Sequence, residues 1–237
     1  MLETKIMREI LEVLRKNETF LISSHINPEG DALGSQLALY SLLSDIGKNV
    51  SVVDSDPVPF AYRFLPNAAV LKCVNPTTSH ETRGTRHLDL ESEVVDLESI
   101  PDVEVAIIVD CGNLNRIGDK LAEHLRPSQA LINIDHHQSN EYFGTHNLVN
   151  TGASAAGEII FNLMEYGGVE ISLDQAVCLY TAILTDTGSF RYSNTTPEVH
   201  RIAARLIDIG VKPAQIAELV YETIPYRRAK LLGLALE

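Results

Sequence analysis

Short segments that are apolar on both faces alternate with amphipathic helical patterns along this chain of 237 residues. Residues 105–109 and 130–134 are the clearest apolar segments, and residues 19–24 and 50–53 are shorter examples. Strands that bury both faces are typical of a parallel sheet with helices on each side. The alternation therefore predicts an α/β fold, in which helices flank a mainly parallel β-sheet.

The helical segments have apolar residues that recur three or four positions apart. They cover residues 2–14, 33–47, 155–166, 173–184, 197–209 and 213–221. Thr196 and Pro197 form a helix start, and Gly210 forms a helix end. Residues 54–100 combine several prolines with a polar stretch, so for them we expect a loop with at most one short helix.

The net charge of −13 limits the partners of the chain, which has 19 Lys and Arg residues against 32 Asp and Glu residues. A field of this sign repels a phosphate backbone, so we expect no binding of duplex DNA. Short phosphorylated ligands stay open, provided that bound cations supply local positive charge.

The cysteine pattern and the N-terminus indicate a cytoplasmic protein. Cys73, Cys111 and Cys178 are scattered without a C-x-x-C spacing, which is typical of a reducing compartment. The first residues carry charges where a signal peptide would have its apolar core. No apolar run approaches the roughly 20 residues that cross a bilayer, so we expect no membrane contact.

Acidic and histidine side chains follow three of the predicted strands directly. They are His25, Glu29 and Asp31 after the first strand, Asp110 after residues 105–109, and Asp135, His136 and His137 after residues 130–134. The carboxyl ends of parallel strands form the ligand-binding edge of an α/β sheet. We therefore expect these groups at one edge of one sheet, joined by Asp186 after the helix 173–184.

The chemistry of these groups favours a metal centre. Four carboxylates, those of Glu29, Asp31, Asp110 and Asp186, carry four negative charges that two divalent cations would neutralise. Without cations, packing them together would raise some of their pKa values strongly. Carboxylate and imidazole ligands suit Mn²⁺, Mg²⁺ and similar ions.

Four motifs in this order resemble those of the DHH phosphoesterases. They are His-x-x-x-Glu-x-Asp-Ala-x-Gly-Ser at 25–35, Val-Asp-Cys-Gly at 109–112, Asp-His-His at 135–137 and Leu-Thr-Asp-Thr-Gly at 184–188. One such motif is weak evidence, whereas four in order are strong. The sequence is most similar to the branch of cytoplasmic oligoribonucleases that also dephosphorylate 3′-phosphoadenosine 5′-phosphate.

The resemblance implies a role for each motif residue. One divalent cation would be held by His25, Glu29 and Asp110, and the other by Asp31, Asp110, His136 and Asp186. Mn²⁺ is the expected ion, with Mg²⁺ as the alternative. His137 would face the substrate phosphate, and Asp135 would orient His136 through a ring N–H. The reaction implied is hydrolysis of a phosphoester in short single-stranded RNA or a small nucleotide by metal-activated water.

Two arginines are candidate phosphate contacts. Arg191 follows Asp186 closely, and Arg116 follows Asp110. Each has a second interpretation, since Arg191 could form a salt bridge to a helix and Arg116 could lie in a turn.

The sequence departs from the family pattern in two places. Glu29 stands where the family usually has Asp, which leaves a competent oxygen ligand but moves its carboxylate. The family branch also has a second, smaller domain with a Gly-Gly-Gly-His motif, which these residues lack. We expect residues 1–221 to form the DHH catalytic domain and residues 222–237 to start a helical linker to a C-terminal domain absent from this chain. Without that domain, metal binding should survive while substrate affinity and turnover fall.

Two other functions stay open. A DHH-type inorganic pyrophosphatase would share the metal motifs, although the run at 187–192 resembles the oligoribonuclease branch. A nucleotide-binding or regulatory module with weak catalysis would be consistent with Glu29. A homodimer is also compatible with the sequence.

Overall fold

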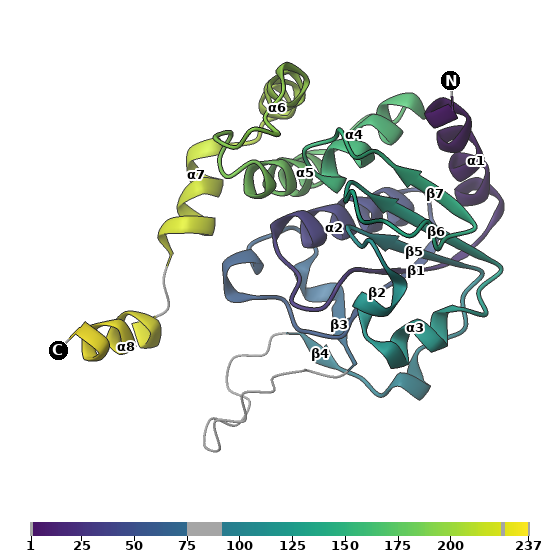
Figure 1. Cartoon of the computed structure of the whole chain (residues 1–237), viewed down its shortest axis with the longest axis horizontal. Helices are drawn as coiled ribbons and strands as arrows, with labels where there is room; N and C mark the ends of the chain where they lie inside the picture. The colour runs from purple at the N-terminus through teal and green to yellow at the C-terminus, as the bar shows by residue number, and fades with distance from the viewer. Residues whose placement is uncertain (1, 75–91, 224–225, 237) are drawn as a thin grey trace.

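The computed structural model describes residues 2–74, 92–223 and 226–236 (Figure 1). Their centre is a seven-stranded sheet in which every described pairing is parallel. The strands are β1 (Thr19–Ser23), β2 (Asn49–Asp54), β3 (Leu71–Cys73), β4 (Glu93–Val94), β5 (Val105–Val109), β6 (Ala130–Asp135) and β7 (His146–Val149). The predicted α/β fold with a mainly parallel sheet is therefore confirmed.

The strand order β4-β3-β2-β1-β5-β6-β7 reverses direction between β1 and β5. The chain builds outward from β1 to β4, then crosses back and builds outward from β5 to β7. Such a reversal opens a crevice at the carboxyl ends of the two central strands, where α/β proteins bind ligands. Ser23 of β1 pairs with Ile108 of β5, so the residues that follow both strands emerge side by side.

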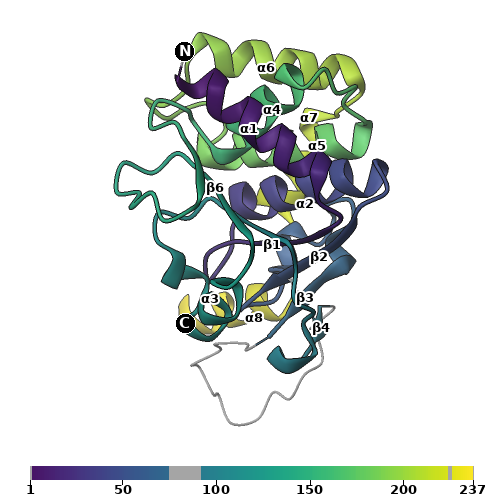
Figure 2. The same cartoon turned by 90° about the vertical axis from the view of Figure 1, so that its right-hand side faces the viewer.

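Helices cover both faces of the sheet (Figures 1 and 2). Those described are α1 (Leu2–Lys16), α2 (Gly30–Asp45), α3 (Asp119–Leu125), α4 (Ala156–Tyr166), α5 (Leu173–Asp186), α6 (Pro197–Ile209), α7 (Pro213–Ala217) and α8 (Tyr226–Leu236). One buried cluster joins α1, α2, α4 and α5 to one face, and a smaller cluster joins α3 to the other. Phe20 and Ile22 lie in the first cluster and Leu21 in the second, which explains why β1 is apolar on both faces.

The structure corrects the prediction for residues 54–100. Short strands β3 and β4 extend the sheet there, and 3₁₀ turns occupy 60–62, 68–70 and 97–99. Strands of two or three residues are too short to show a periodic pattern. The polar stretch, residues 77–86, lies outside the described residues.

Other differences concern element boundaries. The strand β7 and the helix α3 were not predicted, because each is short. The predicted helix 213–221 ends as α7 at Ala217 and continues as a π-helical turn, Glu218–Glu222. The domain boundary after residue 221 stays a prediction.

Among the described helices, none has the length and apolar character needed to cross a bilayer.

Candidate metal centre

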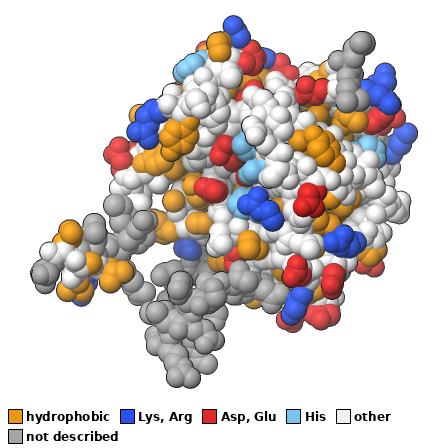
Figure 3. Space-filling view, in the orientation of Figure 1, with side chains coloured by type: hydrophobic (Ala, Val, Ile, Leu, Met, Phe, Trp, Pro, Cys, Tyr) orange, Lys and Arg blue, Asp and Glu red, His pale blue; other side chains and the backbone are white. Residues whose placement is uncertain are grey.

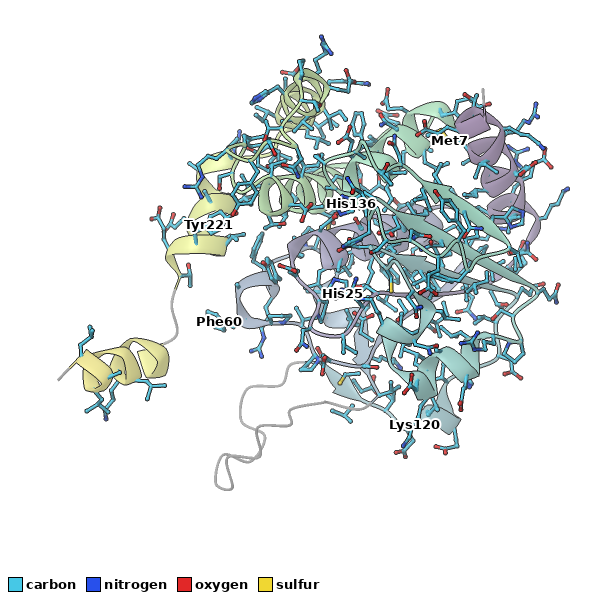
Figure 4. All side chains as sticks on the ribbon, in the orientation of Figure 1. Met7, His25, Phe60, Lys120, His136 and Tyr221 are labelled. Atoms are coloured by element: carbon cyan, nitrogen blue, oxygen red, sulfur yellow. The ribbon has the colours of Figure 1, made fainter. Side chains whose placement is uncertain are left out.

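His25 and Asp110 follow the two central strands, β1 and β5, and their side chains meet where these strands end. Figure 4 labels His25 and, near it, His136. The Nε2 atom of His25 lies 3.5 Å from Oδ2 of Asp110. The Nδ1 atom of His25 is 2.8 Å from the Ile26 carbonyl oxygen, which can only accept, so Nδ1 carries the proton. Nε2 of neutral His25 is therefore the nitrogen available to a metal ion.

Asp110 occupies a strained backbone conformation. Its φ of +52° lies in the left-handed region, and its N–H donates to Ile134 in the neighbouring strand β6. Such a conformation at a residue other than glycine is of the kind that costs about 1–3 kcal/mol and clusters at functional sites. Its Oδ1 atom is buried and has no hydrogen-bond partner among the described residues. A buried orphan oxygen of this kind suits a bound cation.

His136 lies among three carboxylates from separate elements. Its Nε2 atom is 3.4 Å from Oδ1 of Asp110, 3.6 Å from Oδ2 of Asp186 and 3.7 Å from Oδ2 of Asp31. These separations exceed good hydrogen bonds, for which about 2.7–3.2 Å is typical. They suit atoms that share an ion at about 2.0–2.2 Å from each ligand. Figure 3 shows acidic and histidine side chains gathered near the middle of this face.

The ligand atoms form two overlapping groups. Asp31, His136 and Asp186 make one group, and Asp110, His136 and His137 make the other, with the ligand atoms of each within 4.8 Å of one another. His25 approaches Asp110 from the opposite side, through Oδ2 rather than Oδ1. Asp110 therefore stands between the imidazole of His25 and the group around His136.

Asp31 is held by the N-terminus of a distant helix. Its two oxygens accept hydrogen bonds from the N–H groups of Ala156 at 2.7 Å and Gly157 at 2.9 Å, in the first turn of α4. Ser35, one turn further along α2, donates its hydroxyl to the same carboxylate at 3.1 Å. The positive end of α4 favours this negative charge.

A close helix crossing brings Asp31 and Asp186 together. The helices α2 and α5 pack so tightly that a Cβ atom on Gly34 would overlap the carbonyl oxygen of Cys178. Asp186 is the last residue of α5, and Asn194 donates its side-chain N–H to the Asp186 carbonyl at 3.0 Å. The helix extends two residues beyond its predicted end, so Asp186 lies on it and not after it.

Burial and the neighbouring charges shift the pKa values of the groups in this cluster. Burial and the charges of Asp110 and Asp186 raise the pKa of Asp31 well above its ordinary value. Burial also raises the pKa of Asp186, and the charge of Asp110 adds to this. Burial opposes ionisation of Asp110, but His136 and His25 outweigh it and lower its pKa to about 2. Burial opposes protonation of His136, but Asp110, Asp31 and Asp186 raise its pKa to about 9.

Asp135 orients His137, not His136 as the sequence analysis expected. Its Oδ1 atom lies 2.7 Å from Nδ1 of His137, and its Oδ2 atom accepts a hydrogen bond from Asn140 at 2.6 Å. Burial raises the pKa of Asp135, but these two hydrogen bonds outweigh it and leave the pKa lowered. The ionised carboxylate accepts a hydrogen bond from the Nδ1–H of His137, which leaves Nε2 without the proton in the neutral ring.

Three predicted site residues lie in neither group and have exposed side chains: Glu29, Arg116 and Arg191. Glu29 precedes α2 with an exposed side chain, and its charge acts on Asp186. Arg191 is exposed, and its Nε donates to the Gly188 carbonyl at 2.7 Å. Arg116 is exposed in a 3₁₀ turn. Burial and the charge of Arg116 oppose protonation of His25, but Asp110 and the Ile26 carbonyl outweigh them and raise the pKa of His25. Their roles as ligand and phosphate contacts stay predictions.

The sequence analysis missed Asp54 and Asn140. Asp54 ends β2 and is fully buried, and Asn140 links Asp135 to Asn133. Asp54 has the same sequence signal as Asp110, an acidic residue directly after an apolar strand. Asn140 has no such signal.

The chain is similar to known proteins in both sequence and fold. The family described as DHH family, N-terminal domain, matches residues 19–183. The bifunctional oligoribonuclease and PAP phosphatase NrnA of Thermus thermophilus is 35% identical over 214 residues, which cover 90% of this chain and 57% of that protein. Its namesake from Bacillus subtilis is 26% identical over 221 residues, covering 91% and 61%. The chain thus spans about three fifths of the length of these relatives.

A solved structure extends the likeness to the fold. The crystal structure of an exopolyphosphatase-related protein from Bacteroides fragilis matches with a TM-score of 0.81 and 26% sequence identity. The match covers 98% of this chain and 64% of that one.

Proposed function

Because the chain belongs to the DHH family, we propose that the cluster around Asp110 and His136 is the centre of a phosphoesterase that uses two divalent cations. The observation that carries the proposal is the surplus of carboxylates around His136: Asp31 and Asp110 are buried, Asp186 is partly exposed, and Oδ1 of Asp110 has no hydrogen-bond partner among the described residues. Three carboxylates from separate elements around one imidazole need more positive charge than that imidazole supplies.

Each cation would have its own set of side chains. His25 and Asp110, with Glu29, would hold one cation, and Asp31, Asp110, His136 and Asp186 would hold the other. Asp110 contributes to both sets because its two oxygens face opposite sides of the site. Bound in this way, the cations would lower the pKa of a coordinated water and neutralise charge on the phosphoryl group.

His137 would act on the substrate directly. Asp135 fixes its ring through Nδ1, and the side chain is 35% exposed, so Nε2 can reach a bound phosphate. In the protonated state, Nε2 would donate to a phosphoryl oxygen or to the leaving oxygen. Asp135 would keep the ring in this orientation, which makes it part of the same substrate-facing unit.

The substrate we propose is short single-stranded RNA, 3′-phosphoadenosine 5′-phosphate, or both. The names of the Thermus thermophilus and Bacillus subtilis relatives, an oligoribonuclease and a PAP phosphatase, support this class. Arg116 and Arg191 are exposed cations that would add charge-assisted bonds to substrate phosphates. We propose Mn²⁺ as the physiological ion, a cytoplasmic location, and no duplex DNA partner, since the net charge is −13.

The test combines metal binding with hydrolysis. Titration calorimetry with Mn²⁺ should give two ions for the wild-type chain and fewer for Asp110→Asn. With Mn²⁺ present, a ribodinucleotide should yield mononucleotide, and 3′-phosphoadenosine 5′-phosphate should yield phosphate. Asp110→Asn should release neither.

Other results would reject this function. Faster turnover of inorganic pyrophosphate than of both nucleotides would favour a pyrophosphatase. Binding of Mn²⁺ and nucleotide without turnover, also in a chain extended to the length of the relatives, would favour a regulatory module.

A further inference from the structure

Two carboxylates at the end of β2 hold the loop that carries His25. Asp54 accepts a hydrogen bond from the Ser24 N–H at 2.8 Å and from the Ser23 hydroxyl at 3.2 Å. Asp56 accepts one from the Asn27 N–H at 2.8 Å. The backbone on both sides of His25 is thus attached to the strand beside it.

The Asp54 carboxylate also holds the helix that follows the loop. The side-chain N–H of Gln36 in α2 donates to Oδ1 of Asp54 at 2.7 Å. This is the oxygen that accepts from Ser24. One buried atom therefore connects the residue before His25 with the helix that carries Asp31.

The segment after β5 completes the support of this loop. Ser55 donates its hydroxyl to the Ile117 carbonyl at 2.6 Å, and the Ile26 N–H donates to the Arg116 carbonyl at 2.8 Å. His25 is therefore fixed between the ends of β2 and β5, with its Nδ1–H on Ile26 and its Nε2 toward Asp110.

An ionised carboxylate at this position costs folding free energy. Asp54 has no exposed surface, and burial raises its pKa to about 6 although Ser24, Gln36 and Ser23 stabilise its charge. Burying an ionisable group costs free energy even when it is hydrogen-bonded. A carboxylate oxygen can, however, accept from several donors at once, which a neutral apolar side chain cannot do.

We infer that Asp54 is the positioning residue of the first cation site, because it fixes the backbone at Ser24 and so the direction in which Nε2 of His25 points. Asp54 belongs to neither group of candidate ligands. The inference rests on the proposed function, since it concerns the cation assigned to His25 and Asp110. Groups that orient a metal-binding histidine typically change metal affinity about 10- to 100-fold when they are removed.

The experiment measures Mn²⁺ affinity by calorimetry for wild type, Asp54→Ala, His25→Ala and the double variant. Asp54→Ala should weaken one of the two ions about 10- to 100-fold and leave the other within about twofold. His25→Ala should weaken the same ion, and Asp54→Ala should add little to it, because coupled residues are not additive. Asp54→Asn should recover most of the affinity, since its amide oxygen can still accept from Ser24 and Gln36.

Glu104 offers a matched control at the opposite end of β1. Its carboxylate accepts hydrogen bonds from the N–H groups of Glu18 at 2.7 Å and Thr19 at 3.0 Å. Asp54 holds the backbone at the carboxyl end of β1 through the N–H of Ser24. Glu104→Ala should change both Mn²⁺ affinities less than about twofold. An equal loss in Glu104→Ala and Asp54→Ala would mean that general destabilisation causes the effect, and would overturn the inference.

Two further outcomes separate the inference from the proposed function. If wild type binds two ions and Asp54→Ala keeps both affinities, only the inference fails. If wild type binds none, the proposed metal centre fails, and the inference with it. If circular dichroism shows that Asp54→Ala does not fold, Gln36→Met replaces it in the experiment. This variant removes one hydrogen-bond donor to Asp54 and should weaken only the cation assigned to His25 and Asp110.

Discussion

The Asp31 carboxylate accepts a hydrogen bond from the backbone N–H of Ala156, 125 positions further along the chain, at 2.7 Å. The helix α4 that begins there has no side-chain cap of its own. Asp31 therefore satisfies a helix N-terminus and faces His136 with the same carboxylate. The candidate site is built into the packing of the helices and does not lie on loops alone.

Without divalent cations, the stability of the chain should fall as the pH rises from about 6.5 to about 9. Folding raises the pKa of His136 from 6.5 to about 9, because the favourable effect of Asp110, Asp31 and Asp186 exceeds that of burial. The folded state then binds more protons than the unfolded state across this range. The contribution of His136 to stability is therefore fully present below pH 6.5 and is lost as the pH rises to about 9. Urea denaturation in EDTA at several pH values measures this slope.

His136→Gln is the control for that pH profile. Its slope between pH 6.5 and 9 should be shallower than that of wild type. An identical slope in both proteins would show that other groups are responsible.

Asp186→Asn should stabilise the chain in EDTA while it weakens Mn²⁺ binding. Burial and the charge of Asp110 raise the pKa of Asp186, so its ionised form is unfavourable in the folded state at neutral pH. Removing that charge should raise the melting temperature by about 2 °C at pH 7.5. Differential scanning calorimetry with EDTA and with Mn²⁺ should show opposite effects, and a lower melting temperature in EDTA would contradict the prediction.

Asp135→Asn should reduce kcat about 10²-fold and leave Mn²⁺ affinity unchanged. The variant replaces the carboxylate that accepts a hydrogen bond from His137 Nδ1 with an amide, so the ring is held less firmly in the orientation and tautomer that leave Nε2 toward the substrate. Steady-state kinetics with a dinucleotide measure the loss of kcat, and calorimetry measures the affinity. A loss of Mn²⁺ binding would instead place Asp135 in the support of His136.

Gly34→Ala should cost about 1–3 kcal/mol of unfolding free energy and weaken Mn²⁺ binding. The added methyl group would overlap the Cys178 carbonyl oxygen, so α2 and α5 must separate, and Asp31 must move away from Asp186. Gly233→Ala is the matched control, because no atom lies within 4 Å of a Cβ there. It should be neutral or stabilising by up to about 1 kcal/mol in α8. Equal destabilisation by both substitutions would argue against the tight crossing.

Much of the fold could be predicted from local sequence patterns. The segments 105–109 and 197–209 match β5 and α6 in full, because a two-faced apolar run and a capped amphipathic helix are strong short-range signals. The strands β3 and β4 were missed, since two or three residues carry no period and their stability comes from pairing, of β3 with β2 and of β4 with β3.

For the candidate site, the sequence alone determined which side chains are candidate ligands and that they follow strand ends. His25, Asp110 and His136 were found in this way, because parallel strands bring their carboxyl ends to one edge. Only the tertiary structure decided which groups face one another. It paired Asp135 with His137, left Glu29 exposed, and placed the buried Asp54 behind His25. These relationships depend on strand register, on the tight crossing of α2 and α5 and on side-chain directions, all of which arise from contacts between distant segments.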